Sequence, residues 1–260
     1  MNIQYLKKEG ELINIINGYY KSFDKIFIFT QNTILSHYKF LAKLNANIHI
    51  CSEGEACKTT KQYEQSIKYL HNYQCNKKSL IIGIGGGAIT DFSGYVASTY
   101  MRGIPHNFIP TSLLAMVDAA IGGKTALNAN GIRNLLGTYK NPNDIIIYTN
   151  FLKTLSKEDV INGCAEIIKY SLIMDIQLFE YLEKNIINIF PNLNIAMIQS
   201  IIKKCINHKT NIVKQDQYDI GIRNILNFGH TVGHALESYY TFNMPHGKAI
   251  LYGMIVASYL

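Results

Sequence analysis

The fold is decided by residues 79–91, which read SLIIGIGGGAITD. The apolar run over 79–84 predicts a buried strand, and the glycines behind it allow a tight turn into a helix. Such glycines let backbone N–H groups approach a phosphate at the positive end of that helix. The GxGxxA pattern is typical of dinucleotide sites, yet no acidic residue follows between Phe92 and Val117, where a usual Rossmann site has one. The loop therefore predicts a pyrophosphate site in a non-standard arrangement, and a tight turn without a ligand is the alternative.

Strand and helix signals alternate on both sides of this loop. Further strands are predicted from short apolar runs at 25–29, 47–50 and 107–109. Helices are predicted from apolar spacing in the stretch that ends at Leu41 and over 59–72, 157–183, 194–213 and 230–240. The βαβα order predicts a parallel sheet with helices on both faces. We therefore expect a Rossmann-like α/β domain over residues 1–155, followed by an all-α domain over residues 156–260.

Composition limits the class of protein. The 260 residues are 48% hydrophobic and 17% charged, with a formal net charge of +7. The lysines are spread out rather than gathered in a block, so we expect no nucleic-acid partner and attribute part of the charge to an anionic small substrate. No run of about 18 apolar residues and no signal-peptide core occurs, so we expect no membrane partner. Five scattered cysteines without a CxxC pair suit reduced thiols in the cytoplasm.

A cluster of histidines predicts a metal centre. His230 and His234 are four residues apart, which places both imidazoles on one face of a helix, and His246 follows a short linker rich in turn formers. Three histidines, or two with a carboxylate, suit a catalytic divalent metal that keeps an open position. Incidental histidines on a surface helix are the alternative. Glu166 and Lys169, three residues apart on a helix, are either an ordinary surface pair or, beside such a metal, a further ligand and a substrate contact.

Polar residues are dense in the centre of the chain. Asp118 and Lys124 flank a glycine pair, where side chains and backbone can both reach a ligand. The sequence GGKT lacks the GxxxxGK spacing of a P-loop, which excludes that class of ATPase. Basic residues that can bind phosphate or carboxylate are Arg102, Lys124, Arg133, Lys209 and Arg223. Each of them alone can equally be an exposed charge, but their density in one region favours a binding site.

Five runs in this order resemble the 3-dehydroquinate synthase family of sugar phosphate cyclases. They read GGGAITDFSGYVASTYMRGI from residue 85, PTSLLAMVDAAIGGKTALN from 110, NGCAEIIKYSLI from 162, RNILNFGHTVGHALE from 223 and PHGKAILYGM from 245. The resemblance extends from about Cys51 to the C-terminus and, more faintly, to the first strand. It implies an NAD-binding α/β domain, a helical domain with a catalytic zinc that cobalt can replace, and a homodimer.

The same resemblance assigns roles to individual positions. Matching metal ligands are Glu166, His230 and His246. Matching substrate and catalytic positions are Arg102, Asp118, Lys124, Arg133, Asn134, Lys169, Lys209, Arg223, Asn227 and His234. Matching NAD positions are Glu55, Lys58, Gly85, Gly86, Gly87, Asp91, Thr111, Ser112, Lys124, Arg133, Phe151 and Thr154. In the family, the residue at the position of Arg102 can reach a neighbouring subunit's site.

The activity implied by the resemblance belongs to the shikimate pathway of aromatic amino acid biosynthesis. It converts 3-deoxy-D-arabino-heptulosonate 7-phosphate to 3-dehydroquinate and phosphate through transient oxidation by NAD, phosphate elimination, re-reduction and an intramolecular aldol reaction. Lys169 is expected to position the substrate hydroxyls, and His234 is the candidate for proton transfer. Lys209 and Arg223 suit a substrate carboxylate, because a substrate without one leaves two buried cations unpaired.

The chain also departs from the family pattern. The departures are Arg133 for Lys, Ile132 for Gly, Ala129-Asn130 for His-Pro, Gln31 for an acid near the NAD ribose and Thr90 for Gly. The chain ends at Leu260, where the family continues with more helices, so we expect either a fragment or an unusually reduced enzyme with a shortened helical domain. The alternatives to a dehydroquinate synthase are another sugar phosphate cyclase, a catalytically dead NAD- or metal-binding remnant, and a metal-dependent alcohol dehydrogenase of the same architecture.

Overall fold

The chain forms two compact units. A computed structural model describes residues 1–190, 193–240 and 243–260. Met1–Thr111 and Gly123–Asn150 form the sheet unit, and Ser112–Gly122 and Phe151–Leu260 form the helical unit. The sequence places one boundary after residue 155, whereas contacts place it after Asn150 and also assign the central segment Ser112–Gly122 to the helical unit. The reason is local, because this segment packs against two helices of that unit, α5 (Lys157–Met174) and α7 (Ile195–Gln215).

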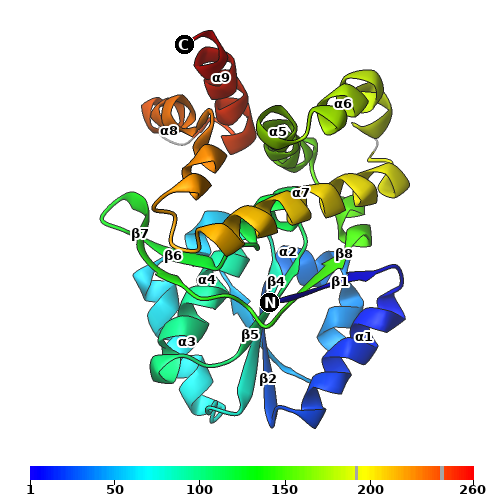
Figure 1. The fold of residues 1–260 in the computed structure, drawn as a ribbon. Coiled ribbons are helices and arrows are strands. Elements are labelled where there is room, and N and C mark those ends of the chain that lie inside the picture. Colours follow the sequence, from blue (N-terminus) through cyan, green and yellow to red (C-terminus); the bar gives the residue numbers. More distant parts are fainter. Residues whose placement is uncertain (191–192, 241–242) are drawn as a thin grey trace. The chain divides into compact units, whose positions relative to one another are not determined.

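The sheet unit contains a parallel sheet with the strand order β1-β8-β5-β4-β2-β3. Its strands are β1 (Asn2–Leu6), β2 (Lys25–Gln31), β3 (Asn47–Cys51), β4 (Ser79–Gly85), β5 (His106–Pro110) and β8 (Asp144–Tyr148). Every residue of β4 is buried, as expected of a central strand covered on both faces. Figure 1 shows α1 (Glu9–Gly18) on one side of the sheet and α3 (Thr60–Asn72) and α4 (Gly87–Thr99) on the other. The predicted Rossmann-like sheet with helices on both faces is confirmed.

The strands β1 and β8 were not predicted, and two further features of the sheet unit differ from the prediction. The helix expected to continue to Leu41 ends at His37 as α2 (Asn32–His37), because Tyr38 leaves the helical region at φ −124° and ψ 67° before a short 3-10 turn, Lys39–Lys43. An unpredicted antiparallel hairpin joins β6 (Lys124–Ala129) and β7 (Ile132–Tyr139). Its two-residue turn, Asn130 and Gly131, has positive φ at both positions, which matches the twist of the flanking strands.

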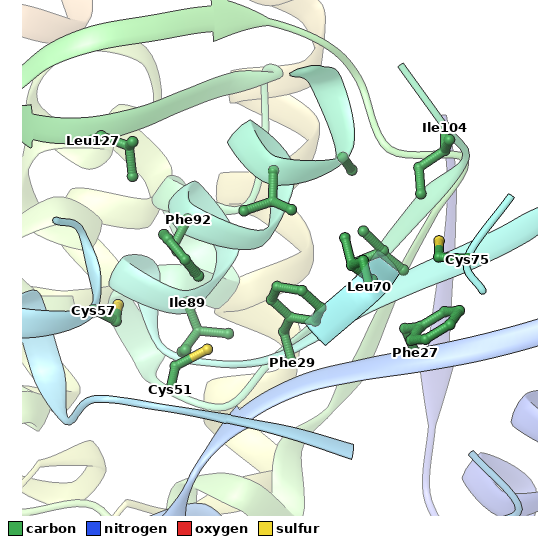
Figure 2. Packing of buried hydrophobic residues seen from close by; sticks show 13 residues of the cluster. Phe27, Phe29, Cys51, Cys57, Leu70, Cys75, Ile89, Phe92, Ile104 and Leu127 are labelled. Carbon is green, nitrogen blue, oxygen red and sulfur yellow. The ribbon is translucent and has the colours of Figure 1, made fainter. Parts of the chain in front are cut away.

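The core of the sheet unit lies between the sheet and the helices α3 and α4. Phe27 and Phe29 of β2 project toward Leu70 of α3 and Ile89 and Phe92 of α4 (Figure 2). The Phe29 and Phe92 rings have centroids 6.2 Å apart. Burying each such side chain contributes about 1.5–3 kcal/mol, so this apolar layer holds α4, and with it the glycine loop, against the end of β4.

The helical unit consists of α5, α6 (Ile176–Ile189), α7, α8 (His230–Tyr239) and α9 (His246–Tyr259), together with a π-helical turn, Ala115–Ala119, and a 3-10 turn, Ile222–Asn227. The predicted helix over 157–183 is wrong as one element. Asp175 interrupts it at φ −144°, and its Oδ1 accepts a hydrogen bond from the backbone N–H of Leu178, which caps α6. Asn194 caps α7 in the same way. The helix α9 was not predicted.

Among the described residues, no helix combines the length and the apolar character needed to cross a bilayer. The cysteines Cys51, Cys57, Cys75, Cys164 and Cys205 are buried as free thiols.

Candidate active site

The helical unit brings a carboxylate and two imidazoles together. Glu166 of α5, His230 of α8 and His246 of α9 each offer one ligand atom, and these atoms lie within 4.8 Å of one another. The Nε2 atoms of His230 and His246 lie 3.6 and 3.7 Å from Oε1 of Glu166. These are the three residues predicted as metal ligands, and the fold gathers them from three helices.

Glycines allow the three helices to approach this closely. A Cβ at Gly253 of α9 would lie 2.9 Å from the backbone nitrogen of Gly233 in α8. A Cβ at Gly247 would lie 2.5 Å from Cα of Asn162 in α5. Since His246 is the first residue of α9 and directly precedes Gly247, close packing of that glycine on α5 places the imidazole beside Glu166.

The second nitrogen of each imidazole also has an acceptor. Nδ1 of His230 lies 3.3 Å from the carbonyl oxygen of Phe228, and Nδ1 of His246 lies 3.4 Å from Oε1 of Glu237. A carbonyl and a carboxylate only accept hydrogen bonds, so both Nδ1 atoms donate. Each Nε2 is therefore the atom directed to Glu166, which is the arrangement that metal-binding histidines adopt.

The charge states of Glu166 and His230 suit a divalent cation. Burial raises the pKa of Glu166, but the ammonium of Lys169 outweighs it and the net shift is downward, so the carboxylate is ionised. Burial and Lys169 lower the pKa of His230 to about 4, which keeps that imidazole neutral. Burial lowers the pKa of His246, but Glu166 and Glu237 raise it to about 9. Oε2 of Glu166 is paired with Nζ of Lys169, and within the described residues Oε1 has no hydrogen-bond partner of standard geometry. A buried anion of this kind suits a cation between the three donors.

Lys169 is a buried partner of Glu166 rather than half of a surface pair. Its side chain is 2% exposed, that of Glu166 is 1% exposed, and the two form an ion pair along α5. Burial lowers the pKa of Lys169, but the carboxylates of Glu166 and Asp118 raise it by more. The net shift is upward, so Lys169 keeps its positive charge. The surface-pair alternative is therefore wrong. The ammonium is under the influence of two carboxylates.

Asp118, in the π-helical turn, accepts bonds from two helices. Its Oδ1 lies 2.8 Å from Nζ of Lys209 in α7 and accepts a 2.5 Å hydrogen bond from the hydroxyl of Tyr170 in α5. Lys209 also donates to the backbone oxygen of Asp118 at 2.8 Å. Burial raises the pKa of Asp118, but Lys209 and Lys169 outweigh it and the net shift is strongly downward. The segment Ser112–Gly122 thus supplies the counter-ion for a buried lysine of the helical unit.

Arg223 provides a second buried cation. Its guanidinium donates from Nη1 to the backbone oxygens of Gly122 at 3.2 Å and Gln217 at 2.8 Å. Burial is the main cause that lowers the pKa of Lys209, and the charge of Arg223 contributes in the same direction. The expectation that both cations are unpaired without a substrate carboxylate is wrong for Lys209, which pairs with Asp118. Arg223 donates to backbone oxygens, so its positive charge still favours an anionic group.

Other predicted substrate positions are at the surface of their units. The side chain of His234 is 62% exposed, and its Nε2 lies 3.9 Å from Oε2 of Glu237. Asn227 is exposed, donates to Oδ1 of Asn224 at 3.4 Å and lines a largely apolar cavity of about 550 Å³ between α5, α8 and α9. In the sheet unit Arg102, Lys124 and Arg133 are exposed.

The glycine loop begins where β4 ends. Gly86 directly precedes α4, and no side chain caps the start of this helix. The backbone N–H groups of Ile89 and Thr90 donate to the carbonyl oxygen of Gly86 at 3.1 Å. A Cβ at Gly85 would lie 2.7 Å from Cβ of Ile89, so that glycine is required by packing. Thr111 donates its N–H to Gly85 at 2.9 Å, which ties the end of β5 to the loop. The uncapped start of α4, at Gly87, leaves backbone N–H groups for an anion.

A buried lysine gathers the remaining cofactor candidates of the sheet unit. Nζ of Lys58 lies 2.7 Å from Oδ2 of Asp91, 2.5 Å from Oδ1 of Asn134 and 3.8 Å from Oε2 of Glu55. Asn134 was predicted to contact the substrate, but the structure places it beside Lys58, which was predicted to bind NAD. The cause is local, because Asn134 has φ 56° and donates its N–H to Oδ1 of Asn128 at 2.9 Å.

Three further cofactor candidates belong to the helical unit. The hydroxyl of Ser112 accepts from the N–H of Ala115 at 3.2 Å, Phe151 is buried, and the hydroxyl of Thr154 donates to the oxygen of Phe151 at 3.3 Å. Sequence reasoning missed Glu237 and Tyr170. The position of Glu237 three residues after His234, on the same helix face, is a signal that could have found it. No sequence signal links Tyr170 to Asp118.

Comparisons with known proteins agree with the motifs. Residues 48–162 match the family model "3-dehydroquinate synthase N-terminal", and residues 163–260 match "3-dehydroquinate synthase C-terminal". The 3-dehydroquinate synthase of Clostridium tetani is 38% identical over 242 residues, which cover 91% of this chain and 65% of that protein. The enzyme of Pyrococcus abyssi is 40% identical over 244 residues, which cover 91% of this chain and 70% of that protein.

A solved structure supports the same grouping. The chain resembles 2-deoxy-scyllo-inosose synthase, solved with carbaglucose-6-phosphate, NAD+ and Co2+, with a TM-score of 0.84 and 26% identity. The match covers 97% of this chain and 71% of that one. The chain therefore spans about two thirds of the length of these relatives. Because the two family models together match residues 48–260, the chain belongs to the 3-dehydroquinate synthase family.

Proposed function

We propose that this chain is a phosphate-eliminating cyclase, a carbon–oxygen lyase, that converts 3-deoxy-D-arabino-heptulosonate 7-phosphate to 3-dehydroquinate and phosphate. The observation that carries the proposal is the donor set of Glu166, His230 and His246, in the same unit as the buried cations Lys209 and Arg223. Family membership and the likeness to a cyclase solved with NAD+ and Co2+ support it. The donor set suits a metal that keeps an open position, and the cations suit an anionic substrate.

Both cofactors fit residues of the chain. Glu166 is ionised, and both imidazoles can bind a metal in their neutral form. The three groups suit zinc or cobalt, because both metals accept nitrogen and carboxylate ligands. The uncapped start of α4 at Gly87 suits a pyrophosphate, and Lys58 with Asp91 supplies a fixed polar pair in the same unit. When bound, NAD supplies a reversible hydride acceptor and the metal supplies Lewis-acid polarisation of substrate hydroxyls.

The protein's own residues bind and orient the substrate. Lys169 keeps a proton on Nζ, because its carboxylate neighbours stabilise the ammonium, and it donates to a substrate hydroxyl. Lys209 and Arg223 bind the substrate carboxylate, and Asp118 holds Lys209 in place. His234, which is exposed, moves a proton between substrate and solvent.

The test is phosphate release from the heptulosonate phosphate by purified protein with zinc and NAD, with NADH absorbance followed in the same sample. The proposal expects phosphate and dehydroquinate in equal amounts without net NADH. Net NADH would instead indicate an alcohol dehydrogenase. Folded, metal-loaded protein that releases no phosphate would refute the activity and favour the binding remnant.

A second cyclase activity is the alternative that the likeness to 2-deoxy-scyllo-inosose synthase favours. A Lys209→Met variant separates the two. If the carboxylated substrate is correct, the variant loses far more kcat/KM toward it than toward a sugar phosphate without a carboxylate. If wild-type protein turns over only the uncarboxylated sugar, the alternative is correct.

We also propose a homodimer. In β7 the apolar side chains of Ile132, Leu135, Leu136 and Tyr139 are 39–54% exposed, and within the described residues this strand pairs along one edge, with β6. An exposed apolar strand edge suits a second copy of the chain. Light scattering after size-exclusion chromatography should give twice the chain mass of 29.4 kDa, and a Leu135→Lys variant should shift the mass toward that of the monomer.

A further inference from the structure

A buried carboxylate in α8 lies between two imidazoles. Glu237 is 4% exposed. Its Oε1 lies 3.4 Å from Nδ1 of His246, and its Oε2 lies 3.9 Å from Nε2 of His234. The other ring nitrogen of His246, Nε2, lies 3.7 Å from Glu166. The imidazole of His246 is therefore held between two carboxylates, one at each nitrogen.

We propose that Glu237 is a positioning residue that orients His246 for metal binding, an inference that rests on the proposed function. A carboxylate only accepts hydrogen bonds, so it selects the form of His246 that carries a proton on Nδ1. When a cation replaces the proton on Nε2, this form directs the lone pair of Nε2 to the cation. Partners of this kind fix the ring of a metal-binding histidine and strengthen it as a ligand.

The position of Glu237 in the fold supports this role. His246 is the first residue of α9, where backbone hydrogen bonds of the helix restrain it least. Glu237 lies in the last turn of α8, and α8 packs closely on α9 through Gly233 and Gly253. A carboxylate on one helix thus restrains a ligand at the start of the other.

A competing arrangement uses the same carboxylate as a ligand. His234, Glu237 and His246 also offer three atoms within 4.8 Å of one another. A cation there would occupy Nδ1 of His246 and would depend on His234, whose side chain is 62% exposed. The geometry favours the first set, because Glu166 is fully buried and both of its histidines have acceptors at Nδ1.

The test measures Co2+ binding to the metal-free full-length chain by visible absorbance, with a competing chelator. Glu237→Ala should weaken binding about 10- to 100-fold. Glu237→Gln should weaken it less, because its amide oxygen still accepts from Nδ1. His234→Ala should stay within about 2-fold of wild type, and so should Glu180→Ala, which removes an exposed carboxylate of α6. A similar loss in His234→Ala and Glu237→Ala would overturn the proposal, and so would unchanged affinity in Glu237→Ala.

Folding is monitored separately by circular dichroism of the metal-free variants. If Glu237→Ala does not fold, Glu237→Gln decides, since a change in its Co2+ absorption bands supports positioning and a spectrum and affinity identical to wild type contradict it. The proposed function has its own readout here. Wild-type chain that fails to bind Co2+ would sink the metal-dependent activity, whereas wild-type binding with unaffected Glu237 variants would sink the positioning role alone.

Discussion

At the scale of single residues, burial decides how much an ion pair contributes to stability. The Asp118–Lys209 pair has side chains 23% and 6% exposed, whereas Lys68 and Glu64 in α3 are 71% and 69% exposed at a similar separation. Water screens the second pair almost completely, while the first pair has lost its hydration and depends on its partner. Two ion pairs of similar length therefore differ strongly in what they contribute to stability.

We expect Asp118→Asn to lower the free energy of unfolding by about 3–5 kcal/mol, because Lys209 is left as an uncompensated buried charge. Urea unfolding measures this loss. The matched control is Lys68→Ala, for which a change within about 0.5 kcal/mol is expected. Equal effects in the two variants would contradict the assignment of Asp118 as a counter-ion.

His106 of β5 makes stability depend on pH. It is 1% exposed, and neither ring nitrogen has a hydrogen-bond partner among the described residues. Burial, with a smaller contribution from Lys140, lowers its pKa to about 3, against 6.5 for the unfolded chain. Between these values the unfolded state binds a proton that the folded state does not, so stability falls as the pH falls from 6.5 toward 3.

We expect His106→Leu to flatten this dependence. Each pH unit below 6.5 costs the wild-type chain about 1.4 kcal/mol through this histidine, and so about 2 kcal/mol at pH 5. Urea unfolding of both proteins at pH 7 and pH 5 gives the stability that each loses between these pH values. Subtracting one loss from the other cancels the contribution of the other titrating groups. Parallel losses in the two proteins would show that His106 is not responsible.

At the scale of elements, the contact between α8 and α9 depends on Gly253. A Cβ there would lie 2.9 Å from backbone atoms of Gly229 and Gly233, which are not the ends of flexible side chains. We expect Gly253→Ala to cost about 1–3 kcal/mol and to weaken Co2+ binding, since these helices carry His230 and His246. Thermal unfolding and the Co2+ titration measure the two effects.

The control is Gly10→Ala in α1, where a Cβ meets nothing within 4 Å. This variant should be neutral or more stable by up to about 1 kcal/mol, because alanine loses less backbone entropy on folding. Should Gly253→Ala melt and bind Co2+ like Gly10→Ala, the close packing of the two helices would not be what holds the donor set.

The elements also show what the sequence can predict. Buried strands such as β4 and the capped helix α3 follow from apolar patterns, and the core of the sheet unit confirms them. The hairpin of β6 and β7 carried a usable signal in Asn130-Gly131, and β8 carried one in Ile145–Ile147. The break at Asp175 could not be read from spacing, because apolar residues continue through it. It depends on the non-helical backbone of Asp175, which ends α5, and on its bond from Leu178, which caps α6.

The candidate site was predictable where residues that are close in the sequence are also neighbours on one helix. The pairs Glu166 with Lys169 and His230 with His234 lie within single helices, so spacing places each pair on one face. The contact of Asp118 with Lys209 joins residues 91 positions apart, and it depends on the tertiary placement of the segment Ser112–Gly122. Local periodicity contains no information about such a contact.

At the scale of the whole molecule, the helical unit is discontinuous in the sequence. Ser112–Gly122 provides Leu113, whose side chain fills the space in front of Gly163 in α5, as well as Asp118 and the backbone oxygen of Gly122 that binds Arg223. A fragment over 151–260 lacks all three contacts and leaves the charges of Lys209 and Arg223 buried without these partners.

We therefore expect the fragment 151–260 to lack a cooperative thermal transition by circular dichroism, whereas the fragment 112–260 shows one. Both fragments contain every helix from α5 to α9. They differ in residues 112–150, which hold the segment Ser112–Gly122 and also β6, β7 and β8 of the sheet unit. Cooperative melting of 151–260 at the temperature of the longer fragment would contradict this account.

The pairing of β1 with β8 has a consequence for synthesis on the ribosome. Asn2 is paired in register with Asp144, 142 residues later, so β1 leaves the exit tunnel long before its neighbour β8 is made. At about 5–20 residues per second, that interval lasts roughly 7–30 s. Throughout it, the backbone N–H and C=O groups of β1 have no partner strand. A chaperone that shields such segments near the tunnel would act on this protein until β8 has been synthesised.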